Sequence, residues 1–367
     1  MRTPMTVAWL AMLACAATSA QDAPPPTPTP APATSQTSSY FNPSISLIGN
    51  FLGVAGTNAV DNLPSASLRE TELGFQAVVD PYARADVFVS LGEENEVGVE
   101  EGYLTFTSLP WNLLVKVGRM RVSFGKINSL HLHVLPWADE PLNVVNLLGG
   151  DEGWIGSGVS VARLVPLPGD VFSELTVQAF RGDAEGLFEA PKRSDLAFNG
   201  HYRVFADLSD SSNLDLGASC AIGPNGTSAN AKTRLQGLDV TYRWKPLQHG
   251  NYRSLVLRAE LFGSERERPE GTVKATGWFA SAEVQLARRW WIGVRGEAAG
   301  HAQDTSIKDT GTAATLTFWP SEFSQLRAEI RQRRYGGPNT AGPSDYTANE
   351  VLLQLQFAIG AHGAHPF

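Results

Sequence analysis

The sequence predicts an all-β protein: a transmembrane antiparallel β-barrel of about 16 strands with a constriction loop folded into it. From about residue 44 to the end of the 367-residue chain, stretches of alternating apolar and polar side chains are separated by turns. In the last stretch, Val351, Leu353 and Leu355 share one parity, and Gln354 and Gln356 share the other. Successive side chains of a strand point to opposite faces, so each strand has one face for lipid and one for water. Connections that alternate between short and long also indicate an outer-membrane barrel.

The segment before the barrel is predicted to be an export signal and a linker. Arg2 precedes a short apolar run, and Thr18-Ser19-Ala20 offers small residues for cleavage. A lipoprotein cleavage site at Cys15 is the alternative, although Met12 stands where Leu is usual. The predicted segments are a signal peptide at 1–20, a Pro/Thr-rich periplasmic linker at 21–40 and the outer-membrane β-barrel at 41–367.

Composition excludes several other classes of protein. No run approaches the roughly 18 apolar residues of a membrane-spanning helix. A net charge of −8 argues against a nucleic-acid partner. After cleavage, Cys220 is the only cysteine, which excludes an internal disulfide and a cysteine zinc cluster. Its parity in the strand predicts that Cys220 faces lipid.

The strands follow one another at regular spacing, and an even number suits a single bacterial barrel chain. The predicted strands are residues 44–54, 68–80, 83–92, 96–108, 112–122, 155–165, 172–182, 195–208, 212–222, 232–245, 253–264, 274–287, 289–301, 310–319, 324–335 and 349–360.

The two kinds of connection predict an orientation in the membrane. Short turns are expected in the periplasm, with amphipathic rings beside them at the headgroup level. These rings belong to Tyr82, Trp111, Phe172, Trp244, Tyr252, Trp290, Trp319 and Phe323. The long connections, expected outside the cell, are residues 55–67, 183–194, 223–231, 265–273, 302–309 and 336–348.

The longest connection, residues 123–154, is rich in apolar side chains such as Leu130, Leu135 and Trp137. A long apolar loop is costly in water, so we expect it to fold into the barrel and narrow it. Small residues at Gly156 and Gly158 would make room for it along the wall.

Charged residues of the polar parity are expected to line an aqueous lumen, because charge facing lipid is costly. Each one by itself is more simply explained as half of a cross-strand ion pair, whereas together they would set the field for passing solutes. The candidate lining and constriction residues are His131, His133, Asp139, Glu140, Lys116, His201, Arg203, Arg243, Arg258, Arg295, Arg327, Arg331 and Arg333. The ladder of Arg327, Arg331 and Arg333 favours a slight preference for anions.

The segment 101–106 reads Glu-Gly-Tyr-Leu-Thr-Phe, and the run from Val115 to Lys126 reads Val-Lys-Val-Gly-Arg-Met-Arg-Val-Ser-Phe-Gly-Lys. Together they resemble a strand–turn–strand segment of the phosphate-selective porin O/P family, where such a run precedes the constriction loop. Ser123 stands where that family prefers Pro. The resemblance implies a sixteen-stranded porin that is often a homotrimer. The family's basic phosphate-site residues do not map onto this chain. The loop 128–152 is also similar to uncharacterised outer-membrane proteins, some of them labelled zinc-regulated receptors.

His131 and His133 are spaced so that, on an extended loop, both rings would face one side. They could share a metal ion with Asp139 or Glu140, but two polar side chains in a constriction explain the pattern as well. The sequence therefore predicts no cofactor and no bound metal. It lacks a Gly-x-Ser-x-Gly elbow, and we do not expect an enzyme.

The predicted function is passive diffusion of small hydrophilic solutes or ions through a porin in the outer membrane of a Gram-negative bacterium. The alternative is a substrate-specific uptake channel for an anion or a metal-related solute, and an outer-membrane enzyme is less favoured. The expected partners are outer-membrane lipid, lipopolysaccharide, the barrel-assembly machinery and the transported solutes.

Overall fold

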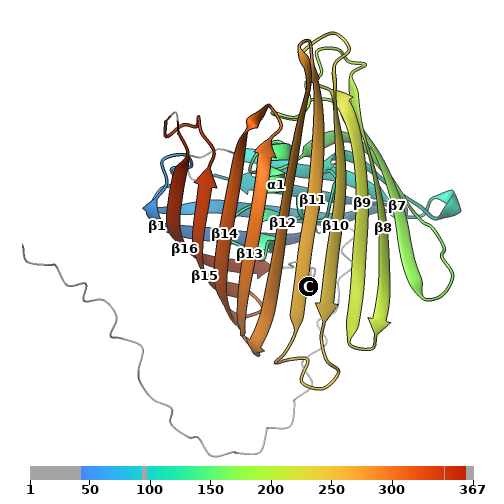
Figure 1. Ribbon diagram of the computed structural model, residues 1–367. Coiled ribbons are helices and arrows are strands. Elements are labelled where there is room, and N and C mark those ends of the chain that lie inside the picture. Colours follow the sequence, from blue (N-terminus) through green and yellow to red (C-terminus); the bar gives the residue numbers. More distant parts are fainter. Residues whose placement is uncertain (1–42, 93–96, 343, 361–367) are drawn as a thin grey trace, which may run out of the picture. The chain divides into compact units, whose positions relative to one another are not determined.

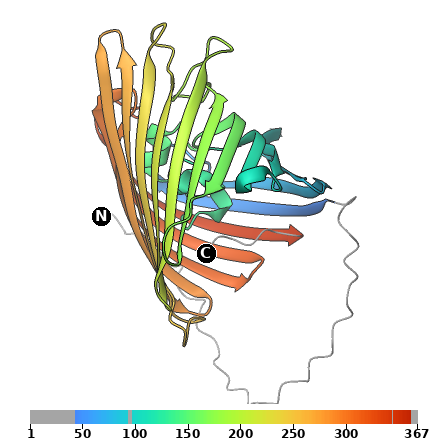
Figure 2. The ribbon, with the colours of Figure 1, turned by 90° about the vertical axis from the view of Figure 1, so that its right-hand side faces the viewer.

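A computed structural model describes residues 43–92, 97–342 and 344–360. Sixteen antiparallel strands form one closed barrel, in which every strand pairs with its neighbours in sequence and β1 pairs with β16. Figure 2 shows the blue first strand beside the red last strands, where the barrel closes. The predicted fold class is confirmed.

The strands agree with the predicted ranges to within a few residues at most ends. They are β1 (Ser44–Thr57), β2 (Ala66–Asp80), β3 (Ala83–Leu91), β4 (Val97–Phe106), β5 (Leu113–Arg121), β6 (Ile155–Leu164), β7 (Val171–Arg181), β8 (Leu196–Ser209), β9 (Ser212–Pro224), β10 (Lys232–Trp244), β11 (Leu255–Arg268), β12 (Gly271–Ala287), β13 (Trp290–His301), β14 (Asp304–Ser321), β15 (Ser324–Tyr335) and β16 (Tyr346–Gly360). The short helices are η1 (Pro110–Asn112), η2 (Ile127–Ser129), η3 (Leu132–Val134) and α1 (Leu142–Leu147). Among residues 43–92, 97–342 and 344–360, no helix has the length and apolar character needed to cross a membrane.

Alternation along each strand sorts the side chains into an outer and an inner face. In β16, Glu350, Leu352 and Gln354 are buried inside the barrel. Leu353 and Leu355 lie on the outer face and are exposed. Cys220 is likewise exposed, as its parity in β9 predicts. The outer face is therefore apolar where the strands would meet lipid.

Replacing Leu355 with Arg should lower the free energy of unfolding in lipid by about 2–4 kcal/mol if the residue lies near the midplane. The reason is that Leu355 points outward and is 42% exposed in the isolated barrel. The matched variant Leu355→Phe keeps the site apolar and should be nearly neutral. Urea unfolding of the two variants in lipid vesicles measures the difference, and equal effects would contradict the assigned outer face.

Gln354 shows that an inner position is not automatically tolerant. The sequence pattern suggests that Gln354→Arg is nearly neutral, because residue 354 meets water. In the structure its amide instead donates to Asn50 and accepts from Arg327, at 2.9 and 2.7 Å. A second guanidinium there would face Arg327 in a buried network, so we now expect Gln354→Arg to destabilise the barrel.

Two of the predicted long connections are extended strands. β11 ends at Arg268 and β12 begins at Gly271, while β13 ends at His301 and β14 begins at Asp304. Segments 265–273 and 302–309 are therefore hairpins joined by two-residue turns. A hairpin that projects beyond the membrane has water on both faces, so its strands can be polar throughout and lose the alternating pattern.

Aromatic rings lie at the short-turn ends of the strands, as the sequence indicates. Tyr82 lies in the turn between β2 and β3, and Trp111 lies in η1 between β4 and β5. Their side chains are 66% and 77% exposed, as amphipathic rings at a lipid headgroup level would be. The placement of these turns in the periplasm stays a prediction.

The hydrophobic core lies inside the barrel and is made by the long connection between β5 and β6 together with the inner wall. Figure 1 shows α1 of this connection behind β12 and β13, and α1 contacts β11, β12 and β13. The predicted signal peptide at 1–20, the linker at 21–40 and the tail 361–367 lie outside the described residues.

Candidate functional site

The connection between β5 and β6, residues 122–154, crosses the lumen to the opposite wall; we call it the constriction loop. Arg327 of β15 donates to the carbonyl oxygen of Trp137 at 2.8 Å, and the amide of Ala138 donates to Glu329 at 2.9 Å. β15 lies far from β5 and β6 around the barrel. The loop therefore spans the interior and does not project away from it.

Aromatic side chains fix the loop to the wall. Trp137 meets Phe279 edge to face with ring centroids 5.1 Å apart, and Phe124 meets Phe262 at the same distance. All four side chains are at most 1% exposed. Burying such a side chain contributes about 1.5–3 kcal/mol, so these contacts alone favour the inserted loop.

Glycine on the inner wall lets the loop approach closely. At Gly277 of β12 a Cβ atom would lie 3.0 Å from Leu147 and 3.1 Å from the backbone of Asn143, both in α1. The sequence singled out Gly156 and Gly158 for this role. A Cβ at either position would instead meet Phe180 of the neighbouring strand, so that expectation is wrong.

Asp139 is the charged anchor of the loop. Its two carboxylate oxygens bind Arg295 at 2.7 Å, Arg331 at 2.7 Å and Arg333 at 2.6 Å. These arginines come from β13 and β15. Burial alone would raise the pKa of Asp139, but the guanidiniums of Arg295, Arg333 and Arg331 hold it well below its usual range. Asp139 is thus a carboxylate that joins the loop to two strands.

Further carboxylates neutralise the same arginines. Arg331 also pairs with Glu350 at 2.6 Å, and Arg333 and Arg295 each lie 3.2 Å from Glu297. Arg331 and Arg333 of the predicted ladder are therefore buried in ion pairs, and Arg327 is buried in hydrogen bonds to Trp137 and Gln354. The ladder therefore exposes little positive charge to a passing anion. An anion preference stays a prediction that these arginines no longer support.

The other predicted lining residues are distributed around the inner wall and do not form one site. Arg203 makes a two-pronged pair with Asp215 at 2.8 Å, and Lys126 of the loop reaches the same carboxylate at 2.5 Å. The remaining contacts are Arg258 with Glu283, His201 with Ser219 and Lys116 over the ring of Tyr103, while Arg243 lies on the same lumen-facing side of β10 as Asp239. Sequence reasoning missed Lys126, because a loop residue has no parity to mark it.

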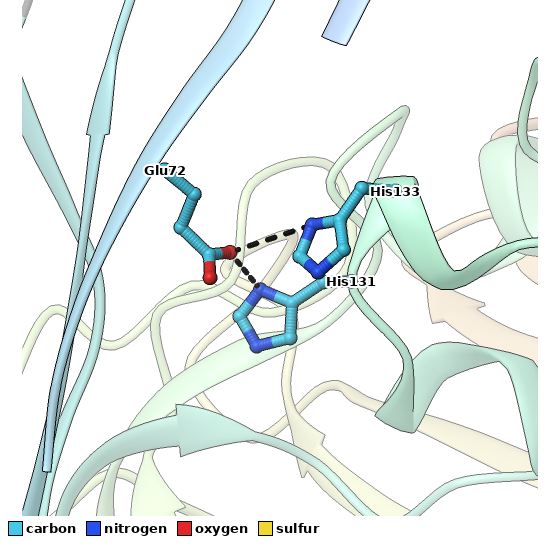
Figure 3. Close-up of side chains that lie close together, drawn as sticks. All are labelled: Glu72, His131 and His133. Carbon is cyan, nitrogen blue, oxygen red and sulfur yellow. Dashed lines mark ion pairs between the residues drawn. The ribbon is translucent and has the colours of Figure 1, made fainter. Parts of the chain in front are cut away.

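The structure groups His131 and His133 with glutamates of the wall, and not with Asp139 or Glu140, the alternative that the sequence left open. His131 Nδ1 lies 2.8 Å from Glu72 and 3.1 Å from Glu100, and its Nε2 lies 2.7 Å from Glu101. Figure 3 shows both imidazole rings turned toward the carboxylate of Glu72.

His133 Nδ1 completes the group, at 3.7 Å from Glu72 and 3.8 Å from Glu70. We call Glu70, Glu72, Glu100, Glu101, His131 and His133 the Glu/His cluster. It joins the loop to β2 and β4, whereas the arginines that bind Asp139 lie on β13 and β15, a different part of the wall.

Two β-bulges lie at this cluster, and the one in β4 brings two adjacent glutamates into it. The register between β3 and β4 shifts after Phe88, which pairs with Glu101, to Val89, which pairs with Val99. Glu100 is the extra residue, so it and Glu101 both turn toward the lumen. A second bulge lies between β1 and β2, where Asn50 pairs with Glu70 and Phe51 with Leu68. Adjacent charged residues within an alternating strand were the sequence signal that could have revealed both bulges.

The carboxylates around His131 set its protonation. Burial alone would lower the pKa of His131, but hydrogen bonds with Glu100, Glu101 and Glu72 raise it to about 11. In the absence of another cation, the ring is therefore an imidazolium that balances part of the acidic charge.

Glu140 follows Asp139 in the loop and is also buried, but among the residues that the structure describes its carboxyl group is not held in ion pairs as that of Asp139 is. Its Oε2 has no hydrogen-bond partner within the described chain. Burial raises the pKa of Glu140 to about 8, although Arg121 opposes the shift. The neutral acid is therefore the form that suits the inserted loop.

The effect of Glu140 on stability should depend on pH. An acid whose pKa is higher when folded stabilises fully below its unfolded pKa and loses that stabilisation as the pH rises. Between about pH 4.5 and about pH 8 the wild type should lose stability relative to Glu140→Gln. The slope should be about 1.4 kcal/mol per pH unit. Urea midpoints of both proteins across this range measure it, and parallel curves would show that Glu140 ionises freely.

A cavity of about 910 Å³ opens between the loop and the ends of several strands. Its lining includes Asp151, Glu152, Asp183, Glu185 and Asp304, with Arg119 and His301 as the basic side chains. We call it the mouth cavity. Its surplus of carboxylates makes the field there negative.

Comparisons with known structures identify the fold. An anion-selective porin from Comamonas acidovorans is 11% identical, with a TM-score of 0.56 over 86% of this chain and 100% of that one. The channel DcaP of Acinetobacter baumannii is 14% identical, with a TM-score of 0.54 over 87% and 96%. A trimer form of OmpT from Vibrio cholerae is 9% identical, with a TM-score of 0.55 over 86% and 99%. The porin-type barrel that the resemblance implied is confirmed, whereas membership of the phosphate-selective group stays a prediction.

Sequence comparison places the chain in a family. No family model matches the sequence. An uncharacterised protein of Aquifex aeolicus (strain VF5) is 30% identical in an alignment of 338 positions that covers 82% of this chain and 70% of that protein. The chain therefore belongs to the same family as this Aquifex aeolicus protein.

Proposed function

We propose that the protein is an outer-membrane channel through which small hydrophilic solutes or ions diffuse passively past the constriction loop. The observation that carries this proposal is the loop that crosses a closed sixteen-stranded barrel and is bound to the far wall through Asp139. An apolar outer face and a charged inner face suit a barrel in lipid that encloses water. We propose a channel and not an enzyme.

The same proposal includes the surroundings of the barrel. The channel would lie in the outer membrane of a Gram-negative bacterium, in contact with lipid and lipopolysaccharide, and the barrel-assembly machinery would insert it. A homotrimer is proposed because a structural neighbour, OmpT of Vibrio cholerae, is described in a trimer form. Mass measurement of the detergent-extracted protein tests the trimer directly.

A second proposal is that the channel prefers cations. It rests on the mouth cavity, where Asp151, Glu152 and Glu185 outnumber the nearby basic groups. Rings of carboxylates concentrate cations at a pore mouth. This departs from the anion preference expected from sequence, because two of the three arginines that suggested it, Arg331 and Arg333, are paired with carboxylates.

Planar-bilayer recording tests both proposals. The purified protein should form discrete conducting channels, and in a KCl gradient the reversal potential should show cation preference. The triple variant Asp151→Asn, Glu152→Gln and Glu185→Gln should shift the reversal potential toward zero. The control Asp345→Asn, in an exposed pair with Arg334 outside the mouth lining, should leave it unchanged. Absence of conductance would refute the channel, whereas conductance with anion preference would refute only the second proposal.

A further inference from the structure

We propose that the Glu/His cluster binds one transition-metal dication of the zinc type, which fastens the constriction loop to β2 and β4. The ligands would be His131, His133 and Glu72, completed by Glu70 or Glu100. The inference goes beyond solute passage, and the binding measurements that test it need no conductance.

The spacing of the candidate atoms fits a single ion. The ligand atoms of Glu72, His131 and His133 all lie within 4.8 Å of one another, as do those of Glu70, Glu72 and Glu100. Around a tetrahedral ion with bonds of roughly 2.0–2.2 Å, neighbouring ligand atoms are about 3.3–3.6 Å apart. The separations from Glu72 Oε2 are 2.8 Å to His131 Nδ1 and 3.7 Å to His133 Nδ1. These two separations lie on either side of that range, and the ligand atoms of His131 and His133 lie no more than 4.8 Å apart.

Glu101 orients His131 for this role. Its carboxylate lies 2.7 Å from Nε2 of His131, so it accepts the Nε2 proton and leaves Nδ1 to face Glu72 and Glu100. A histidine that binds a metal commonly donates its other ring N–H to a carboxylate in this way. If a metal ion replaces the proton on Nδ1, the Nδ1 lone pair and the carboxylate oxygens can all bind that ion.

Most glutamates of the cluster are buried, so water cannot stabilise their negative charge and a nearby cation is favoured. Glu70 and Glu72 are only 6% and 2% exposed. Within the described ranges, Glu70 Oε2 is a buried oxygen with no hydrogen-bond partner, although it lies near Glu72 and Glu100. A buried carboxylate oxygen without a partner is unfavourable unless a proton or a metal ion binds it.

The donor set indicates the class of ion. Two imidazole nitrogens with carboxylate oxygens suit zinc and similar transition metals. Calcium takes six to eight oxygen ligands, and magnesium keeps several waters in an octahedral shell. Neither preference fits a site that includes two ring nitrogens. His131 and Glu100 keep some exposure, at 13% and 15% of their side chains, so an ion can reach the cluster.

The ion would complete a second attachment for the loop. Asp139 binds the wall formed by β13 and β15, and the Glu/His cluster binds β2 and β4. With both attachments made, the segment between them is held across the lumen. Removing the ion should loosen the half of the loop that contains η3 while leaving the Asp139 anchor in place.

Direct binding tests the proposal. The full chain in detergent, stripped with EDTA and dialysed, should bind one equivalent of Zn²⁺ by calorimetry, with no competition from a large excess of Ca²⁺. The Co²⁺ form should show the visible bands of a four-coordinate site. If the stripped wild type binds no Zn²⁺ at micromolar concentration, the proton on His131 and the guanidinium of Arg121, 3.7 Å from Glu100, balance the cluster and the proposal is overturned.

Variants locate the ion. Glu72→Gln should weaken Zn²⁺ binding by more than about 100-fold, and Glu101→Gln by about 10–100-fold. The control His301→Gln, a histidine outside the cluster, should bind as the wild type does. Circular dichroism verifies folding, and the Co²⁺ spectrum of the wild type serves if Glu72→Gln does not fold. Unchanged affinity in folded Glu72→Gln would place the ion elsewhere and overturn the proposal.

Discussion

Replacing Asp139 with Asn is expected to lower the free energy of unfolding by about 3–5 kcal/mol, because it removes the shared partner of three buried arginines. The side chains of Arg295 and Arg331 are at most 1% exposed, so water cannot replace the lost carboxylate while the loop stays inserted. Glu297 and Glu350 remain, but they are already paired with the same arginines. Urea unfolding in lipid vesicles measures the change.

A matched control separates this effect from general loss of charge. Asp345 forms an ion pair with Arg334 at 2.6 Å, but half of its side chain is exposed. Asp345→Asn removes the same charge from a solvated pair, so its effect on the free energy of unfolding should be too small to measure. Equal effects of the two variants would mean that the Asp139 pairs are no stronger than surface pairs, and the loop would then lack its anchor.

Deleting residues 129–148 should leave a folded barrel and raise the single-channel conductance several-fold. The segment contains η3 and α1 and contributes the apolar side chains packed against Phe279 and the other inner-wall residues. Without it, water fills the space and solvates the arginines that Asp139 had bound. The barrel ladder itself is untouched, since residues 129–148 belong to no strand. Planar-bilayer recording gives the conductance, and circular dichroism verifies the fold.

The control for the deletion is a connection away from the lumen. Residues 228–230, between β9 and β10, are exposed. Replacing them with Gly-Ser-Gly should leave the conductance at the wild-type value. An unchanged conductance in the 129–148 deletion would contradict the constriction, and an increase in both variants would point to a general loosening of the barrel.

Local patterns were enough to predict the strands. The alternation from Val351 to Phe357 identifies both faces of β16, because the side-chain period of a strand depends on that strand alone. The apolar content of residues 123–154 also predicted an inserted loop, since exposure of such a segment to water is costly whatever its partners are. The same reasoning failed at 265–273 and 302–309, where polar sequence continues as paired strands.

The sequence by itself determined the barrel, its lipid face and the insertion of the loop, because each follows from where apolar side chains can leave water. Only the tertiary structure decided which charges meet. Asp139 lies more than 150 residues from each of its three arginines, and His131 meets Glu100 and Glu101, which a bulge between β3 and β4 turns inward together. Those partners depend on how the barrel closes and on where its register shifts, and neither is encoded in the local period of one strand.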